Sequence, residues 1–128
     1  MSALDAVLAD PSLKKKFAEK TVIEQAVINW QISWLHKQAH KHQVEPAGDW
    51  WTCWLILAGR GAGKSRAAAE TLAAWAWEQP NTRWLVSAPT SGDLKGVCFE
   101  GDSGLIKIIP SVLIEKYNSS LHEIHLIN

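Results

Sequence analysis

Three glycines, a lysine and a serine stand close together in the middle of the chain, and between them they can hold a polyphosphate. Gly59, Gly61 and Gly63 are followed directly by Lys64 and Ser65. Glycine has no Cβ, so its backbone can adopt positive φ and bring N–H groups against phosphate oxygens. A lysine ammonium at this place can reach β- and γ-phosphates, and a serine hydroxyl can ligate Mg²⁺. The pattern therefore predicts a loop that binds ATP, or another nucleoside triphosphate, together with Mg²⁺.

The segments on either side of the loop predict the elements that would position it. The apolar run 54–58 predicts a strand, and the alanine-rich segment after Ser65 predicts a helix that ends before Pro80. A strand before and a helix after the glycines are the context that the P-loop motif requires. The helix start adds unpaired amides and the positive end of its dipole. Ala58 stands where the motif has its first glycine, and a glycine-rich turn with an accidental Lys-Ser pair is the alternative.

The chain beyond the helix predicts the rest of an α/β fold. Residues 83–88 predict a second strand, residues 94–109 a helical patch interrupted by a glycine turn, and residues 121–127 a third strand. A strand, a helix and a strand in succession form a βαβ unit, which demands a parallel sheet. The predicted fold class is an incomplete P-loop NTPase-type three-layer sandwich with a parallel sheet. Thr90 and Asp93 follow the second strand, so they either approach the nucleotide pocket or form a simple turn.

Residues 1–42 predict an N-terminal helical segment that precedes a partial P-loop ATPase domain at 43–128. Asp10 and Pro11 predict a helix start, with Asp10 as the N-cap. A second helix is predicted from residue 21 to about residue 38, because apolar residues recur there at spacings of four, three and four. These residues are Ile23, Val27, Trp30 and Trp34. Such a stripe packs against its own domain or docks a partner.

Composition excludes several classes of function. Thirteen basic residues balance thirteen acidic ones, so no global field draws the chain onto nucleic acid or an anionic membrane. No apolar run approaches the ~20 residues that cross a membrane, and the N-terminus does not resemble a secretory signal. Cys53 and Cys98 are predicted to be reduced core residues. His36 and His40 have a spacing that can hold a metal, but no third ligand accompanies them, and a solvated face is the favoured interpretation.

The sequence does not show the groups that would complete hydrolysis. A P-loop enzyme needs a carboxylate for Mg²⁺ on a second strand and a residue that orients the attacking water. The nearest candidate is the segment 97–100, in which only three apolar residues precede Glu100. The sequence therefore predicts residues that bind the triphosphate, but it does not show the residues that would hydrolyse it.

Three blocks in a fixed order resemble one protein family, the large terminase subunit of tailed bacteriophages. They read GDWWTCWLILAGRGAGKSRAAAE, RWLVSAPTSGD and VCFEGDSGL. The resemblance covers about residues 40–128 and concerns the N-terminal part of the subunit, in the group whose loop reads GRGAGK and then Thr or Ser. It implies a motor that uses ATP to pump double-stranded DNA into a procapsid in the cytoplasm of the bacterial host. The implied partners are the portal protein and the small terminase subunit.

The resemblance also implies a role for individual residues. Lys64 would contact the phosphates, Ser65 would ligate Mg²⁺, and Arg60 would sense or stabilise the γ-phosphate, which makes Lys64 and Arg60 the catalytic pair. Gln43 resembles a glutamine that can hydrogen-bond adenine, and Thr90 with Asp93 matches a PT-x-x-D block. The implied nucleotide-binding set is Gly59, Arg60, Gly61, Ala62, Gly63, Lys64, Ser65, Arg66 and Gln43. In the family, the Walker B acids, which serve Mg²⁺ in the ATPase site, and the carboxylates of the nuclease would lie beyond Asn128.

Two other functions stay open. The chain can be an inactive remnant or interaction module, or a different P-loop enzyme such as a small-molecule kinase. A kinase would need a lid that carries arginines, and the sequence shows none. A parallel sheet interrupted after three strands exposes an edge and an apolar face, so self-association is predicted as well.

Overall fold

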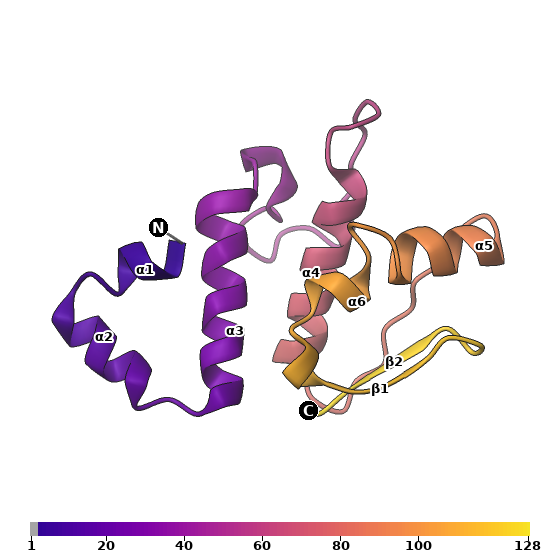
Figure 1. Ribbon diagram of the computed structural model, residues 1–128. Helices are drawn as coiled ribbons and strands as arrows, with labels where there is room; N and C mark the ends of the chain where they lie inside the picture. The colour runs from indigo at the N-terminus through magenta and orange to yellow at the C-terminus, as the bar shows by residue number, and fades with distance from the viewer. Residues whose placement is uncertain (1–2) are drawn as a thin grey trace.

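The computed structural model describes residues 3–128, which form a mainly helical molecule with one small hairpin (Figure 1). The helices are α1 (Ala3–Val7), α2 (Pro11–Ala18), α3 (Val22–Ser33), α4 (Lys64–Glu78), α5 (Ser91–Asp93) and α6 (Leu105–Ile108). Four single turns of other helical type connect them: η1 (Trp34–Gln38), η2 (Lys41–Gln43), η3 (Leu94–Phe99) and η4 (Ser111–Leu113). The strands are β1 (Ile114–Asn118) and β2 (Glu123–Leu126).

Side-chain caps fix the starts of the N-terminal helices. Asp10 Oδ1 accepts a hydrogen bond from Ser12 N at 2.9 Å, and Pro11 opens α2, as the sequence predicts. Thr21 Oγ1 accepts from Glu24 N at 3.2 Å at the start of α3. The chain stays helical through η1 to Gln38, so the prediction of a helix over 21–38 is confirmed.

The core brings α3, α4 and α6 together beside the hairpin. Its buried residues are Trp30, Ala69, Ala73, Phe99, Leu105, Ile108, Ile109 and Leu113. Ile23 and Val27 pack against the same cluster, so the apolar stripe of α3 faces its own molecule. Helix α3 and the elements after residue 42 therefore share one core, and the predicted boundary after residue 42 stays a prediction.

Helix α4 is the longest element, and it ends before Pro80 as predicted. The last carbonyls of a helix lack intrahelical donors. Asn128, far along the chain, supplies them: its side-chain amide donates to Ala76 O at 3.1 Å and to Trp77 O at 2.8 Å. The C-terminal end of α4 is thereby tied to the segment that follows β2.

The sheet differs from the one that the sequence predicts. β1 and β2 pair antiparallel, with Ile114 opposite Leu126 and Asn118 opposite Glu123. β2 lies within the predicted strand 121–127, but its partner is the adjacent segment of chain. In the described residues, the predicted strands 54–58 and 83–88 have no regular strand structure, and no sheet includes them. A strand needs the main chain of a neighbour, which a local apolar pattern does not supply, whereas a hairpin brings its neighbour through a short turn. The parallel three-layer sandwich stays a prediction.

Several apolar side chains of these two irregular segments face solvent. Leu55, Leu57 and Leu85 are 72%, 84% and 88% exposed, while Val86 packs against the core. Cys53, which was predicted to be a core residue, is also exposed, and Cys98 is half-buried. The prediction of a core position is wrong for Cys53, because the apolar run 54–58 that follows it belongs to no sheet. Both cysteines are free thiols, as expected.

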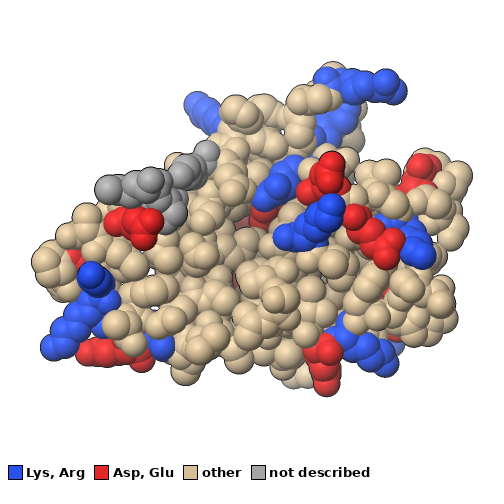
Figure 2. All heavy atoms as spheres, viewed as in Figure 1, with Lys and Arg blue, Asp and Glu red and all other residues tan. Residues whose placement is uncertain are grey.

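Figure 2 shows charged side chains of both signs scattered over one face, among a larger area of other residues. This agrees with the equal numbers of acidic and basic residues. Within residues 3–128, none of the helices has both the length and the apolar character to cross a bilayer.

Truncation of the most buried side chain tests the core. Leu113 is 0% exposed, and we expect Leu113→Ala to lower the free energy of unfolding by about 2–5 kcal/mol, because it leaves a cavity. Leu121→Ala is the control: Leu121 is 65% exposed, and truncation of a surface side chain changes stability by about 0.5 kcal/mol or less. Urea unfolding followed by tryptophan fluorescence measures both. Equal effects of the two substitutions would contradict this core.

Candidate functional site

The loop of residues 59–63, called the glycine loop below, projects from the N-terminal end of α4, whose first residues are Lys64 and Ser65 (Figure 1). Gly61 has φ of 80° and Gly63 has φ of 84°, both in the left-handed region that glycine adopts without steric cost. The positive φ that the sequence predicts for this loop is therefore present at two of its glycines. Gly63 is the N-cap of α4, and no side chain caps that end. The first N–H groups of α4 and its positive dipole end face the loop.

Lys64, the first residue of α4, reaches back across the glycine loop. Its Nζ donates to Ala58 O at 2.5 Å and to Gly59 O at 3.4 Å. Among residues 3–128, no carboxylate forms an ion pair with this ammonium. Lys64 and Ser65 are exposed. The ammonium thus lies over the loop, held by neutral carbonyl oxygens that are weaker acceptors than a charged phosphate.

Two side chains of η2 contact the other end of the loop. Gln43 is only 5% exposed, and its Nε2 donates to Gly63 O at 3.1 Å while its Oε1 accepts from His40 N at 2.8 Å. His42 Nε2 lies 2.8 Å from Ala62 O. Since a carbonyl oxygen only accepts, Nε2 carries the proton of this hydrogen bond. The structure places Gln43 beside the loop, and the role in binding adenine stays a prediction.

Arg66, which the sequence assigns to the nucleotide, is held by neighbouring side chains instead. Its guanidinium contacts Glu70 Oε1 from Nε at 2.9 Å and from a terminal nitrogen at 2.8 Å. The same terminal nitrogen donates to Gln38 Oε1 at 2.8 Å, and the guanidinium stacks 5.4 Å from the centre of the Trp34 ring. The charge of Arg66 is therefore already paired in this structure.

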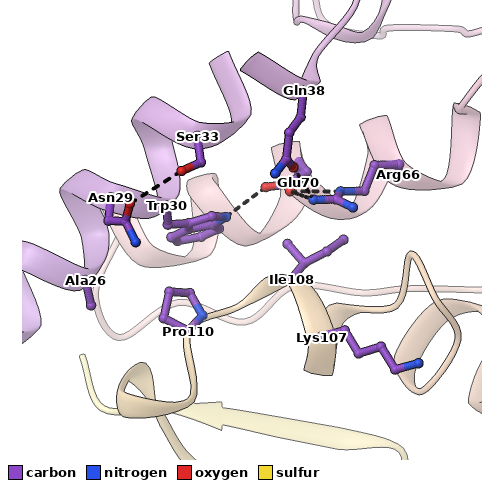
Figure 3. Close-up of a pocket in the computed structure, with 10 residues that line it drawn as sticks. All are labelled: Ala26, Asn29, Trp30, Ser33, Gln38, Arg66, Glu70, Lys107, Ile108 and Pro110. Carbon is purple, nitrogen blue, oxygen red and sulfur yellow. Dashed lines mark hydrogen bonds and ion pairs between the residues drawn. The ribbon is translucent and has the colours of Figure 1, made fainter. Parts of the chain in front are cut away.

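A groove of about 300 Å³ lies beside the first turns of α4 (Figure 3). Its lining residues are Ala26, Asn29, Trp30, Ser33, Gln38, Arg66, Glu70, Lys107, Ile108 and Pro110. Figure 3 shows Trp30 pointing at Glu70 from α3, with Arg66 on the other side of the carboxylate. Of the predicted nucleotide-binding residues, only Arg66 lines the groove. Sequence reasoning did not find this groove, although Arg66 and Glu70 have the spacing of a helical ion pair.

Glu70 is the buried charge of this groove. It is 3% exposed and accepts a hydrogen bond from Trp30 Nε1 at 2.8 Å. Burial raises the pKa of the Glu70 carboxyl above its ordinary value of 4.5, and the hydrogen bonds from Trp30 and Arg66 only partly offset this. The carboxylate therefore joins α3 to α4 at a cost in desolvation.

Thr90 and Asp93 cap the start of α5 with each other. Thr90 Oγ1 accepts from Asp93 N at 3.0 Å and donates to Asp93 Oδ2 at 2.9 Å. The adjacent Ser91 Oγ lies 3.1 Å from His122 Nε2, which links this turn to the hairpin. The structure thus shows the turn that was one of the two interpretations of these residues. Their proximity to a nucleotide stays a prediction.

The remaining predicted residues of the loop are Arg60 and Ala62. Arg60 is exposed, and Ala62 is half-buried, with its N donating to Gly59 O at 3.3 Å. In the described part of the chain, no three His, Cys, Asp or Glu side chains gather as a metal site. A Mg²⁺ held by Ser65 and phosphate oxygens would need no such cluster, because Mg²⁺ keeps several waters beside its substrate ligands.

Comparison with known proteins gives the family of the chain. Residues 55–128, more than half of the chain, match the family model described as terminase large subunit, T4likevirus-type, N-terminal. Proteins of this class act with DNA and the packaging machinery of phages. The chain belongs to the terminase large subunit family, and it corresponds to the N-terminal part of a phage DNA-packaging terminase. No match was found among curated proteins or among solved structures.

The buried carboxyl of Glu70 predicts a pH dependence of stability. Because folding raises its pKa above 4.5, the folded state binds this proton more tightly than the unfolded state. The stabilisation that the protonated Glu70 carboxyl gives the folded state is fully present below pH 4.5. It is lost as the pH rises through the pKa that Glu70 has in the folded state. Glu70→Gln cannot titrate, so we expect the stability of the wild type relative to this variant to fall between pH 4.5 and neutrality.

Urea unfolding at several pH values between 4 and 7 measures this difference. Glu78→Gln, at the exposed end of α4, is the matched control for a surface carboxylate. A stability difference between wild type and Glu70→Gln that stays constant or rises with pH would show that burial does not dominate at Glu70.

Proposed function

We propose that the glycine loop binds the triphosphate of Mg-ATP, in an ATPase that drives double-stranded DNA into a phage procapsid. One observation carries the proposal: a lysine ammonium lies over a left-handed glycine loop at an uncapped helix start. The membership of the chain in the terminase large subunit family supports it. The portal protein, the small terminase subunit and the host cytoplasm belong to the same proposal.

Each polar group of the loop has a proposed role. The main-chain N–H groups of residues 61–65 donate to the β- and γ-phosphates. The Lys64 ammonium leaves the carbonyls of Ala58 and Gly59 for phosphate oxygens, because a negatively charged oxygen attracts the ammonium more strongly than a neutral carbonyl oxygen does. The Ser65 hydroxyl ligates Mg²⁺, and Arg60 approaches the γ-phosphate.

We propose binding rather than turnover for these residues by themselves. Residues 94–99, which precede Glu100, form the helical turn η3 and not a strand that ends in an acid. A carboxylate for Mg²⁺ and a group that orients water are both needed for hydrolysis. Neither is evident near the glycine loop among the described residues, so ATP is expected to remain intact on this chain.

A second candidate function is an interaction module. The observation that favours it is the exposure of Leu55, Leu57 and Leu85 on two segments that belong to no sheet. Exposed apolar side chains on segments without strand partners are the usual sites of association. Self-association is expected from these exposed side chains whether the chain binds ATP or acts as an interaction module. A measurement of self-association therefore does not distinguish the two functions.

The role of Lys64 is tested by titration calorimetry with Mg-ATP. We expect the wild type to bind and Lys64→Ala to lose at least about tenfold in affinity, which corresponds to about 1.4 kcal/mol. Lys95→Ala, which removes an exposed lysine on η3, is the matched control and should bind as the wild type does. Far-ultraviolet circular dichroism checks that all three chains have the same helix content.

Either of two results would contradict the proposal that the glycine loop binds Mg-ATP. One is a wild-type chain that does not bind Mg-ATP at millimolar concentration. The other is an affinity that is the same for the wild type and Lys64→Ala.

A further inference from the structure

The turn η2 places two consecutive side chains on two consecutive carbonyls of the glycine loop. His42 donates to Ala62 O at 2.8 Å, and Gln43 donates to Gly63 O at 3.1 Å. Gly63 O also accepts from Ala67 N at 3.0 Å, the first hydrogen bond of α4. Two peptide groups at the end of the loop are therefore fixed from outside it.

A fixed carbonyl fixes the next N–H group as well. The peptide unit is planar and trans, so the C=O of one residue and the N–H of the next point in opposite directions. The carbonyl of Ala62, bound to His42, turns Gly63 N–H away from η2. The carbonyl of Gly63, bound to Gln43, likewise turns Lys64 N–H away from η2. These two N–H groups stand at the uncapped start of α4, where an anion would bind.

The carboxamide of Gln43 also packs directly against Gly63. A Cβ added to Gly63 would collide with Nε2 of Gln43, and φ there is already 84°. A side chain at Gly63 would therefore have to displace the carboxamide of Gln43.

The same carboxamide has little capacity left to recognise a base. Its oxygen is engaged by His40 N, one of its two N–H groups is engaged by Gly63 O, and the residue is 5% exposed. Adenine recognition would require Gln43 to leave these partners. These contacts favour a role for Gln43 in holding the main chain at Gly63.

We propose that Gln43, with His42, is a positioning residue that aims the amides of the glycine loop at the phosphates. The inference rests on the proposed function, because it assigns a task within the same phosphate site. It differs from the expectation that Gln43 recognises adenine. A positioning residue affects every ligand that carries the phosphates, whereas a base-reading residue affects only the nucleotide with the matching base.

The test compares three probes that share a triphosphate: Mg-ATP, Mg-GTP and Mg-tripolyphosphate, which has no base. We expect Gln43→Ala to weaken all three by the same factor, about three- to tenfold, as for the loss of one hydrogen bond. Gln25→Ala is the matched control, since the amide of Gln25 also donates to main-chain carbonyls, those of Phe17 and Lys20, on another part of the chain. It should leave all three affinities unchanged.

Two results would overturn the proposal. A loss confined to Mg-ATP, with Mg-tripolyphosphate unaffected, would show that Gln43 reads the base. Unchanged affinity for all three probes would show that the contact has no effect on the site. If Gln43→Ala does not fold, His42→Ala replaces it, because His42 is exposed. That variant should also weaken Mg-tripolyphosphate binding, with His36→Ala as its control, and unchanged binding would again overturn the proposal.

A readout without ligand separates this inference from the proposed function. If the wild type binds none of the three probes, the proposed function fails, and the orienting contact is tested by NMR alone. The three-bond couplings between amide and α protons report φ at Gly63 and Lys64. We expect these couplings to change in Gln43→Ala and not in Gln25→Ala. Identical couplings in all three chains would overturn the orienting role.

Discussion

The left-handed backbone of Gly63 is the constraint on which the site depends. At φ of 84° the chain leaves the glycine loop and enters α4 within one residue. Any other residue there would bear about 1–2 kcal/mol of strain from its Cβ, and that Cβ would also collide with Gln43. Because the helix starts at Lys64, its ammonium can fold back over the loop.

Helix α4 connects this constraint to the rest of the molecule. Its first residue carries the ammonium, its middle carries the buried Glu70, and its last carbonyls are bound by Asn128. The contact of Glu70 with Trp30 joins α4 to α3 across the core. A buried ion pair adds little net stability, since desolvation offsets the Coulomb attraction. Its role here is to fix how α3 and η1 sit against the first turns of α4, beside the glycine loop.

Local sequence information was sufficient for the features that depend on neighbouring residues. The cap at Asp10, the helices at 22–38 and 64–78, and the positive φ at Gly61 and Gly63 are all decided within a few residues. The family also followed from short blocks of sequence, and the match over residues 55–128 confirms it. The binding of a phosphate by this loop stays a prediction.

Features that depend on distant partners could not be predicted in the same way. The strands expected at 54–58 and 83–88 need lateral partners, and the structure instead pairs the adjacent segments 114–118 and 123–126. The contacts of Arg66 with Gln38 and of Glu70 with Trp30 depend on how η1 and α3 pack against α4. The double engagement of Gln43 depends on the path of η2. No periodicity in the sequence encodes these contacts.

The central claim is that the amides and the ammonium of this loop share one bound triphosphate. The most direct measurement is a structure of the chain with Mg²⁺ and a non-hydrolysable ATP analogue. The account predicts that Lys64 Nζ leaves the carbonyls of Ala58 and Gly59 for a phosphate oxygen. It also predicts that the N–H groups of residues 61–65 lie about 3 Å from phosphate oxygens. An analogue bound elsewhere, with Lys64 still on those two carbonyls, would contradict it.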